Sequence, residues 1–393
     1  MDLKPGPLAI LGGSPAFAHK LHVGAPNFGD REAFNARMAG VFDRRWFTND
    51  GPLVREFEAE IARRIGVKRC VATCNATIAL EIAIRAAGLT GEVIVPSFTF
   101  IATAHALRWP EITPVFCDID PATHNIDPDQ VEALITPRTT GILGVHVWGR
   151  PAPVERLAEI AAKRKLVLLF DAAHAFGCSH RGRPIGSFGL AEVLSFHATK
   201  VLNSFEGGAV VTNDDALADK IRLMRNFGFA DYDKVVTIGT NGKMTEASAA
   251  MGLTNLESLD HFIAVNRRNY EAYARALADL PGIALIPYDR REANNFHYVV
   301  LEVNEERFGL TRDELAAVLH AENVLARRYF HPGCHRMEPY RTQFPEVRLP
   351  WTEQLSARVL VLPTGAGVDE LAIERIGRIL RDARGLGPEI RGR

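Results

Sequence analysis

The chain has 393 residues, with 46 Lys and Arg against 47 Asp and Glu, so its formal net charge is −1 at pH 7. This balance creates no long-range field, and neither nucleic acid nor a membrane surface is expected as a partner. The N-terminus lacks the pattern of a signal peptide, and no apolar run approaches the roughly 20 residues of a spanning helix. Five cysteines without paired spacing are typical of reduced thiols. We therefore expect a cytoplasmic protein that is long enough for two lobes.

Seven short apolar runs alternate with helical patterns from about residue 69 onward. A helix is predicted before them, because Leu53, Phe57, Ile61 and Ile65 recur every four residues. Strands that alternate with helices predict an α/β fold with a mainly parallel sheet and helices on both faces. The predicted strands are residues 70–73, 93–95, 114–117, 141–145, 166–170, 193–196 and 209–212.

Two of these runs bring polar side chains to one region. The run 166–170 ends in Asp171, and the carboxyl end of a buried strand is where open α/β sheets bind ligands. The next run contains Ser195 and leads directly into His197 and Lys200. Because Ser195 and His197 are two residues apart, they point to the same face of a strand.

Lysine and aspartate at such a place suit the chemistry of pyridoxal 5′-phosphate (PLP). A partly desolvated Lys200 amine has a lowered pKa and is nucleophilic, as a Schiff-base lysine must be. Asp171 at the same cofactor would keep the pyridine nitrogen protonated. Taken singly, a helix-capping Asp171 and a solvated Lys200 are the simpler interpretations. Together the residues favour the cofactor site.

The segments DAAHAFG, SFHATK and EGGAVVTND occur in this order and resemble the cofactor core of the DegT/StrS-type nucleotide-sugar aminotransferases. These are PLP enzymes of fold type I, in the aspartate-aminotransferase superfamily. The resemblance implies that Lys200 forms the Schiff base, Asp171 pairs with the pyridinium nitrogen and His174 lies near the phenolic oxygen. Ser195 would bind the phosphate, and His197 belongs to the same cofactor-binding group. A dehydratase branch carries histidine in place of the lysine, so Lys200 favours transamination.

Two further segments are assigned to the cofactor. Ala76 and Thr77 follow a strand and open a helix, and helix N-termini bind phosphate, although any strand-to-helix turn looks similar. The resemblance implies that this turn holds the PLP phosphate. In the segment PSFTF it implies that Phe100 stacks on the pyridine ring, with Phe98 left in the core. The alternative is that both rings belong to the core.

The segment GTNGKMTE resembles a family motif, G-x-N-x-R/K-M-x-E, whose Asn reaches the PLP phosphate of the partner subunit. Asn241 takes that role, which implies a homodimer with shared active sites. Lys243 lies close by and is expected to bind phosphate or substrate. Without the resemblance, the segment would be a flexible turn with a lysine.

Four further residues are expected near the nucleotide-sugar substrate. The turn-forming segment WFTNDGP resembles one that the family carries near the substrate, which assigns Phe47, although burial as core explains it equally well. The segment YFHPG resembles the family's nucleotide-sugar region and assigns Tyr329, Phe330 and His331.

Two clusters, His174 with Cys178 and His180, and His331 with Cys334 and His335, have some of the residue types of a metal site. Neither has paired CxxC spacing or a histidine pair at i and i+4 on a helix, so no metal is expected.

Beyond residue 251 the pattern changes. A helical stretch over 256–277 is followed by a strand-like run at 296–303 and by a capping box, Thr311 with Glu314, that opens another helix. We expect a PLP-binding large domain over residues 1–250 and a smaller α+β domain over 251–393. The resemblance implies a seven-stranded sheet in the large domain, which agrees with the seven runs.

The segments NDGPLVREFE, VATCNAT, VHVWGRP and NFGF resemble the desosamine-pathway branch of the family. This branch implies amination of dTDP-4-keto-6-deoxyglucose at C-4 with L-glutamate as donor, in deoxyamino-sugar and antibiotic biosynthesis. The alternatives are amination at C-3 of the sugar, a cyclic non-sugar ketone as substrate, and a non-enzymatic PLP-binding regulator. A nucleotide-binding dehydrogenase is disfavoured, because no GxGxxG follows the first strand.

Overall fold

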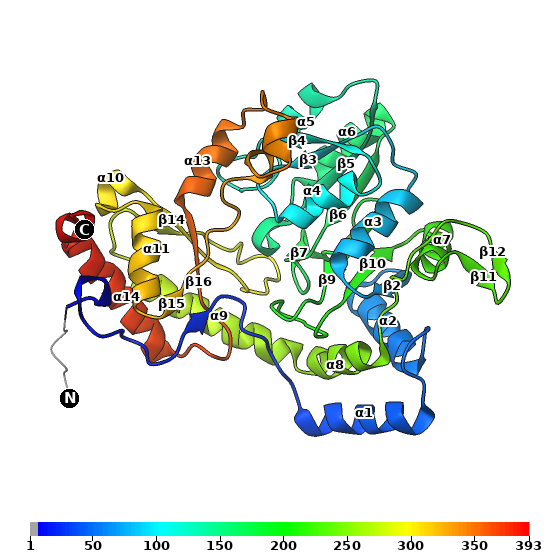
Figure 1. Ribbon diagram of the computed structural model, residues 1–393, viewed down its shortest axis with the longest axis horizontal. Coiled ribbons are helices and arrows are strands. Elements are labelled where there is room, and N and C mark those ends of the chain that lie inside the picture. Colours follow the sequence, from blue (N-terminus) through cyan, green and yellow to red (C-terminus); the bar gives the residue numbers. More distant parts are fainter. Residues whose placement is uncertain (1–6, 393) are drawn as a thin grey trace.

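A seven-stranded sheet forms the centre of the larger lobe in the computed structural model, which describes residues 7–392 (Figure 1). The strand order is β2-β10-β9-β6-β5-β3-β4, and β10 runs antiparallel to both of its neighbours while the other pairs are parallel. Each predicted run coincides with one strand, so the expected α/β fold with a mainly parallel sheet is confirmed. The strands are β2 Arg69–Thr73, β3 Glu92–Pro96, β4 Thr113–Cys117, β5 Thr139–Val145, β6 Val167–Asp171, β9 Ala191–Ser195 and β10 Gly208–Thr212.

Helices bury both faces of this sheet, which explains why its strands are mainly apolar in the middle. In β3, Val93 and Val95 pack into one apolar layer, whereas Ile94 between them packs into the layer on the opposite face. The main helices of the first layer are α3 Ala76–Ala86, α4 Ile101–Arg108 and α7 Asp215–Arg225. The helices of the second layer include α2 Pro52–Ile65, α5 Pro128–Leu134, α6 Val154–Arg164 and α8 Glu246–Glu257.

The C-terminal lobe is built on a smaller antiparallel sheet of order β13-β14-β16. The predicted capping box is present, since Thr311 and Glu314 bond each other's backbone N–H at the start of α11. These elements form the expected α+β arrangement, with a separate apolar core between sheet and helices. They are β13 Ile283–Leu285, β14 Val299–Val303, β16 Val359–Leu362, α9 Leu259–Ala276, α11 Arg312–Ala321 and α14 Glu370–Gly385.

Shorter elements connect and cover the two lobes. No helix within residues 7–392 is long and apolar enough to cross a membrane. The remaining strands are β1 Leu21–His22, β7 Ser179–His180, β8 Arg183–Pro184, β11 Phe229–Asp231, β12 Lys234–Val235 and β15 Val324–Leu325. The remaining helices are η1 Ala9–Leu11, α1 Arg31–Arg44, η2 Val147–Gly149, α10 Glu305–Phe308, η3 Cys334–Arg336, α12 Tyr340–Gln343, α13 Pro350–Arg358 and α15 Gly387–Arg391.

Segments of both lobes cross the proposed boundary between residues 250 and 251. Near the N-terminus, β1 pairs in parallel with β15 of the C-terminal lobe, and Leu8 packs into that lobe's core. In the opposite direction, Tyr340 packs into a core layer of the larger lobe. The long helix α9 contributes Phe262 to one lobe and Tyr273 to the other, and Figure 1 shows α8 and α9 running one after the other along both. We keep 1–250 and 251–393 as a proposed division. A further apolar cluster joins the two parts, with Phe98 and Trp148 from one and Val300 and Phe330 from the other.

Candidate active site

A cavity of about 360 Å³ lies at the carboxyl ends of β6 and β9. The N-termini of α3 and α4 form one side of it, and residues 298, 327 and 329 of the C-terminal lobe contribute to its wall. Most of the predicted cofactor residues line this cavity. They are Ala76, Thr77, Phe100, Asp171, His174, Ser195, His197 and Lys200, and the predicted substrate residue Tyr329 lines it too.

Asp171 is the last residue of β6, and its side chain is buried beneath the cavity. One carboxylate oxygen accepts a hydrogen bond from the Thr103 hydroxyl at 2.8 Å, and the other accepts from the Ala173 backbone N–H at 3.0 Å. Burial raises the pKa of Asp171, while these two hydrogen bonds and the charge of Lys200 act to lower it. The carboxylate is thus fixed in orientation and can pair with a protonated pyridine nitrogen.

Lys200 reaches the cavity from the loop that follows β9. Its Nζ donates a hydrogen bond to the hydroxyl of Tyr298 at 3.3 Å. Burial lowers the pKa of Lys200 to about 8, and the negative charge of Asp171 partly opposes that shift. About a tenth of the amine is therefore unprotonated at pH 7, and this is the nucleophilic form.

The turn before α3 has the geometry of a phosphate site. The side chain of Asn75 caps the helix by accepting from the backbone N–H of Ile78 at 2.9 Å. The backbone N–H groups of Ala76 and Thr77 have no acceptor among residues 7–392, and both residues line the cavity. These groups and the positive end of the helix dipole favour an anion there. A Cβ at Gly208 would lie 2.5 Å from the Ala76 nitrogen, so β10 approaches the turn only because this residue is glycine.

The hydrogen bonding of His174 defines which ring nitrogen carries the proton. Its Nδ1 accepts from the backbone N–H of Trp148 at 3.2 Å, so the neutral ring carries its proton on Nε2. Burial, reinforced by the charge of Lys200, holds the pKa of His174 well below its usual range. The neutral imidazole can therefore donate from Nε2 to an oxygen such as a phenolate.

Phe330 lies behind His174 and not in the cavity wall. Its ring is 5% exposed and stacks on the rings of Trp148, at 5.2 Å, and His174, at 5.9 Å between centroids. Next to it, His331 is exposed and also lies outside the cavity. Of the predicted segment at 329–331, the structure thus brings Tyr329 alone to the cavity.

The remaining cavity residues differ in exposure. Phe100 is 57% exposed, whereas Phe98 is fully buried, as the sequence predicts for that ring. Ser195 has only its cavity side open, at 9% exposed. His197 lies 2.8 Å from the hydroxyl of Thr199, between ring nitrogen and oxygen.

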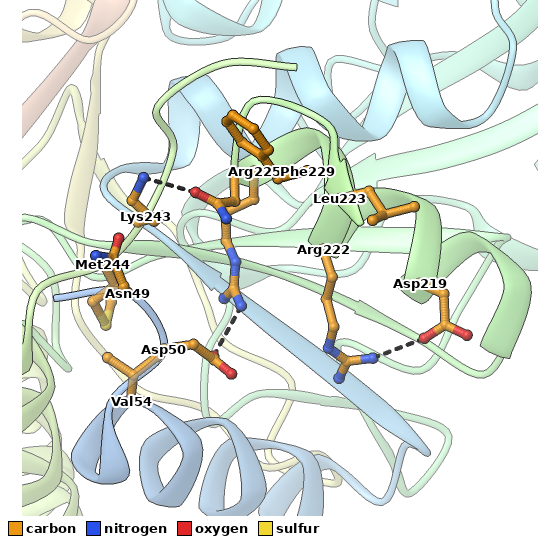
Figure 2. A pocket seen from close by; sticks show the side chains of 11 residues that line it. Asn49, Asp50, Val54, Asp219, Arg222, Leu223, Arg225, Phe229, Lys243 and Met244 are labelled. Carbon is orange, nitrogen blue, oxygen red and sulfur yellow. Dashed lines mark hydrogen bonds and ion pairs between the residues drawn. The ribbon is translucent and has the colours of Figure 1, made fainter. Parts of the chain in front are cut away.

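Phe47, Asn241 and Lys243 lie away from this cavity. Lys243 lines a second hollow of about 410 Å³, where its amine donates to the side chain of Asn226 at 2.9 Å; Figure 2 shows this hollow and Lys243 within it. Asn241 forms an isolated bridge with the backbone of Asn226 and is exposed. Phe47 is 53% exposed and packs beside Phe42. One chain alone therefore does not bring these three residues to the cofactor cavity.

Thr103, Tyr298 and Arg327 are site residues that the motifs do not contain. Thr103 lies inside a helical pattern and Tyr298 inside a strand-like run, so each reads as ordinary secondary structure. Only the folded chain shows that they meet Asp171 and Lys200. No group of three or more His, Cys, Asp or Glu within residues 7–392 is arranged to hold a metal ion.

These residues fit PLP. Free N–H groups and a side-chain-free glycine form an anion cradle at one end of the cavity. The rest of the cavity is lined by the buried carboxylate of Asp171, the Lys200 amine with its lowered pKa, and the neutral donor His174. The sheet order and this donor set define a PLP-dependent enzyme of fold type I.

The chain belongs to the DegT/DnrJ/EryC1/StrS aminotransferase family, which it matches over residues 29–381. It is therefore a sugar aminotransferase, and its cofactor is PLP.

Three relatives illustrate the match. A dTDP-4-amino-4,6-dideoxy-D-glucose transaminase of Shigella dysenteriae is 37% identical over 93% of this chain and 99% of its own length. The GDP-perosamine synthase of Caulobacter vibrioides is 35% identical over 91% of this chain and 96% of its own. The crystal structure of DesI, analysed in the presence of its TDP-sugar product, is 53% identical and covers 98% of each chain with a TM-score of 0.94.

The lowered pKa of Lys200 predicts how capture of PLP by the apoenzyme depends on pH. Only the unprotonated amine reacts, so the capture rate should rise with pH through a midpoint near 8, not near the ordinary lysine value of 10.5. Stopped-flow absorbance of PLP mixed with apoenzyme measures this midpoint. Because Asp171 raises the pKa of Lys200, Asp171→Asn should shift the midpoint downward. A midpoint close to 10.5 would show that Lys200 is solvated.

The close approach of β10 predicts that Gly208→Ala damages the phosphate turn. The added methyl would force the turn away, at about 1–3 kcal/mol, and PLP should bind at least about tenfold more weakly. Equilibrium titration of apoenzyme with PLP measures the change. Gly367→Ala is the matched control, since a Cβ there meets nothing within 4 Å. Equal PLP affinity in both variants would contradict the assignment of this turn.

Proposed function

We propose that this enzyme transfers the amino group of L-glutamate to C-4 of dTDP-4-keto-6-deoxy-D-glucose, in the cytoplasm, as a step of deoxyamino-sugar biosynthesis. The product would be dTDP-4-amino-4,6-dideoxy-D-glucose. The main support is the 53% identity, over 98% of both chains, to DesI, whose structure was analysed with a TDP-sugar product. The Shigella relative acts on the same amino sugar by its name.

The chemistry of both half-reactions depends on proton transfers by Lys200. PLP, when bound, supplies an electron sink for the carbon that loses a proton. The unprotonated Nζ of Lys200 would take the proton from Cα of the donor amino acid and return it to the cofactor carbon. In the second half-reaction the same amine would take a proton from that carbon and give it to C-4 of the sugar. Asp171 holds a proton on the ring nitrogen, and His174 donates from Nε2 to the phenolic oxygen. The low pKa of Lys200 keeps part of the amine unprotonated, as the first of these transfers requires.

The other predicted residues have binding roles in this proposal. The anion cradle around Ala76, Thr77 and Ser195 would bind the phosphate. Phe100 would stack on the ring, and its exposed face in the cavity is available for that contact. The remaining assignments are His197 to the cofactor and Phe47, Lys243, Tyr329, Phe330 and His331 to the substrate, with Phe330 acting through the position of His174.

A homodimer with shared active sites is part of the proposal. Large apolar side chains are exposed on two segments. One is the end of α1 and the residues after it, with Phe42, Trp46 and Phe47, and the other is the β11–β12 hairpin region, with Phe227, Phe229, Tyr232 and Ile238. The two segments are neighbours, because Asn49 and Phe229 line the same hollow (Figure 2). Figure 1 shows the hairpin projecting from the side of the larger lobe. An apolar surface of this kind is typical of a protein interface, and a second copy would place Asn241 near the neighbouring cavity.

Lys200→Ala tests the catalytic role directly. Steady-state transamination should fall at least about a thousandfold, because no other lysine within residues 7–392 lines the cavity to form the Schiff base or move the proton. Absorbance spectra before and after L-glutamate report the first half-reaction in wild type and variant. Lys163→Ala, which removes an exposed lysine paired with Glu132, is the control and should retain activity. Turnover by the Lys200 variant close to wild type would refute the assignment.

The sugar product then identifies the substrate. With dTDP-4-keto-6-deoxyglucose and L-glutamate, NMR of the product should show the amino group at C-4. Amination at C-3 of a 3-keto sugar, or turnover restricted to a cyclic non-sugar ketone, would replace the substrate in this proposal. A wild-type protein that binds PLP but shows no half-reaction with any amino donor would be a regulator.

Subunit mixing tests the shared site. If Asn241 serves the neighbouring cavity, a dimer of one Lys200→Ala and one Asn241→Ala chain contains one intact site. After subunit exchange between the two inactive or weakened variants, about a quarter of the wild-type sites should be restored by random assortment. The same variants assayed without exchange are the control. If activity does not rise above their average, Asn241 does not act across subunits.

A further inference from the structure

Tyr298 contacts the reactive lysine, Lys200, although it lies outside every motif that the sequence analysis identified. It lies one residue before β14 of the C-terminal lobe, and its side chain reaches across to line the cofactor cavity. Its hydroxyl is 3.3 Å from Nζ of Lys200, which belongs to the larger lobe. The side chain is 6% exposed, so this contact is shielded from bulk water.

Neighbouring groups hold Tyr298 on both its ring and its backbone. The ring packs against His174 and Trp148, with centroid distances of 4.5 and 5.4 Å. The hydroxyl of Tyr288 bonds both backbone groups of Tyr298: it donates to the carbonyl at 2.9 Å and accepts from the N–H at 3.2 Å. A phenol that is fixed in this way can define the position of its hydrogen-bond partner.

The preceding residue, His297, fixes the backbone next to the same lysine. Its Nε2 lies 2.7 Å from the carbonyl oxygen of Thr199, and because that oxygen only accepts, Nε2 donates. Burial, reinforced by the charge of Lys200, lowers the pKa of His297 to about 4, so the ring is neutral at physiological pH. The consecutive residues His297 and Tyr298 thus hold the consecutive residues Thr199 and Lys200, one through the main chain and one through the amine.

We infer that Tyr298 is a positioning residue for the proton transfers of Lys200. Its hydroxyl binds Nζ whenever the amine is free and keeps it at the place from which it moves protons. This inference rests on the proposed function of Lys200. No bond changes at Tyr298: the hydroxyl accepts a hydrogen bond from the ammonium and donates one to the neutral amine by rotating its O–H. Burial raises the pKa of Tyr298 well above its usual value, so the phenol keeps its proton.

The charge environment of Lys200 comes from several elements. Asp171 at the end of β6 carries the negative charge that acts on it, and His174 and His297 are neutral neighbours. Glu206 and Arg327 line the same cavity. A bond to the charged form of an amine is about twice as strong as one to a neutral form. Loss of the Tyr298 hydroxyl should therefore favour the neutral form of Lys200, while all these groups are kept.

Tyr298→Phe tests the inference, with Tyr273→Phe as the matched control. Tyr273 is also buried in the C-terminal lobe, where its hydroxyl donates to the carbonyl of Pro363 at 2.9 Å, away from the cavity. The first measurement needs no cofactor: apoenzyme is labelled with an amine-specific reagent at increasing pH, and the Lys200 peptide is quantified by mass spectrometry. The labelling midpoint should fall by about one pH unit in Tyr298→Phe and remain at the wild-type value in Tyr273→Phe.

The second measurement follows the half-reaction of the PLP-loaded enzyme with L-glutamate in a single turnover. Tyr298→Phe should be about tenfold slower, because the amine is no longer held in place, while the affinity for PLP changes less than about twofold. The inference is overturned if either the labelling midpoint or the single-turnover rate equals that of Tyr273→Phe. If wild-type enzyme does not capture PLP on Lys200, the proposed function fails and the inference falls with it.

A second variant covers the case in which Tyr298→Phe does not fold. Replacement of Tyr298 by 3-fluorotyrosine keeps the ring and the hydroxyl but makes the phenol more acidic. A more acidic phenol accepts less well from the ammonium, so the labelling midpoint of Lys200 should again fall, by a smaller amount than without the hydroxyl. An unchanged midpoint in this variant overturns the inference.

Discussion

The structure depends on keeping an amine and a carboxylate together out of bulk water. Burial alone pushes Lys200 and Asp171 toward their neutral forms, and their mutual attraction acts in the opposite direction on both. Thr103 and the Ala173 backbone offset the burial of the carboxylate by hydrogen bonding. The two elements that carry the pair, β6 and β9, are neighbouring parallel strands, so their carboxyl ends meet at one edge of the sheet. The order of strands in the sheet is therefore what brings Asp171 and Lys200 close enough to act on the same cofactor.

The sequence predicted the features that depend on neighbouring residues in the chain. Each strand of the large sheet is buried on both faces, and burial of that kind leaves an apolar run that can be recognised locally. The capping box at Thr311 is equally local. The segment from Asp171 to Lys200 supplies seven of the 21 residues that line the cavity, including the carboxylate and the amine, because two adjacent strands and their loops carry them. The helix expected from residue 256 instead begins at Leu259, after a break at Ser258.

Contacts between distant segments could not be predicted in the same way. Tyr298 and Lys200 are separated by 98 positions, and the tyrosine sits in a run whose pattern is fully explained by β14. Phe330 shows the reverse case: an aromatic residue next to Tyr329 looks suited to a substrate, yet its ring supports His174 from behind. Composition and spacing show that Phe330 is an aromatic residue near the site. They do not show whether its ring faces the cavity or packs on the side of His174 away from it. The proposed roles of Asn241 and Lys243 would require a second chain, whose placement one sequence does not contain.

The pairing of residues 297–298 with residues 199–200 has a consequence for recombination between relatives. A chimera that joins the larger lobe of one aminotransferase to the C-terminal lobe of another would retain every motif around the lysine. It would nevertheless exchange the phenol, the imidazole and the supporting Tyr288 that surround that lysine from the other lobe. Where the second relative carries another residue in place of Tyr298, the inference above predicts that the exchange also alters the basicity of the amine. Under the inference above, catalysis depends on contacts between the two lobes, although each lobe has its own apolar core.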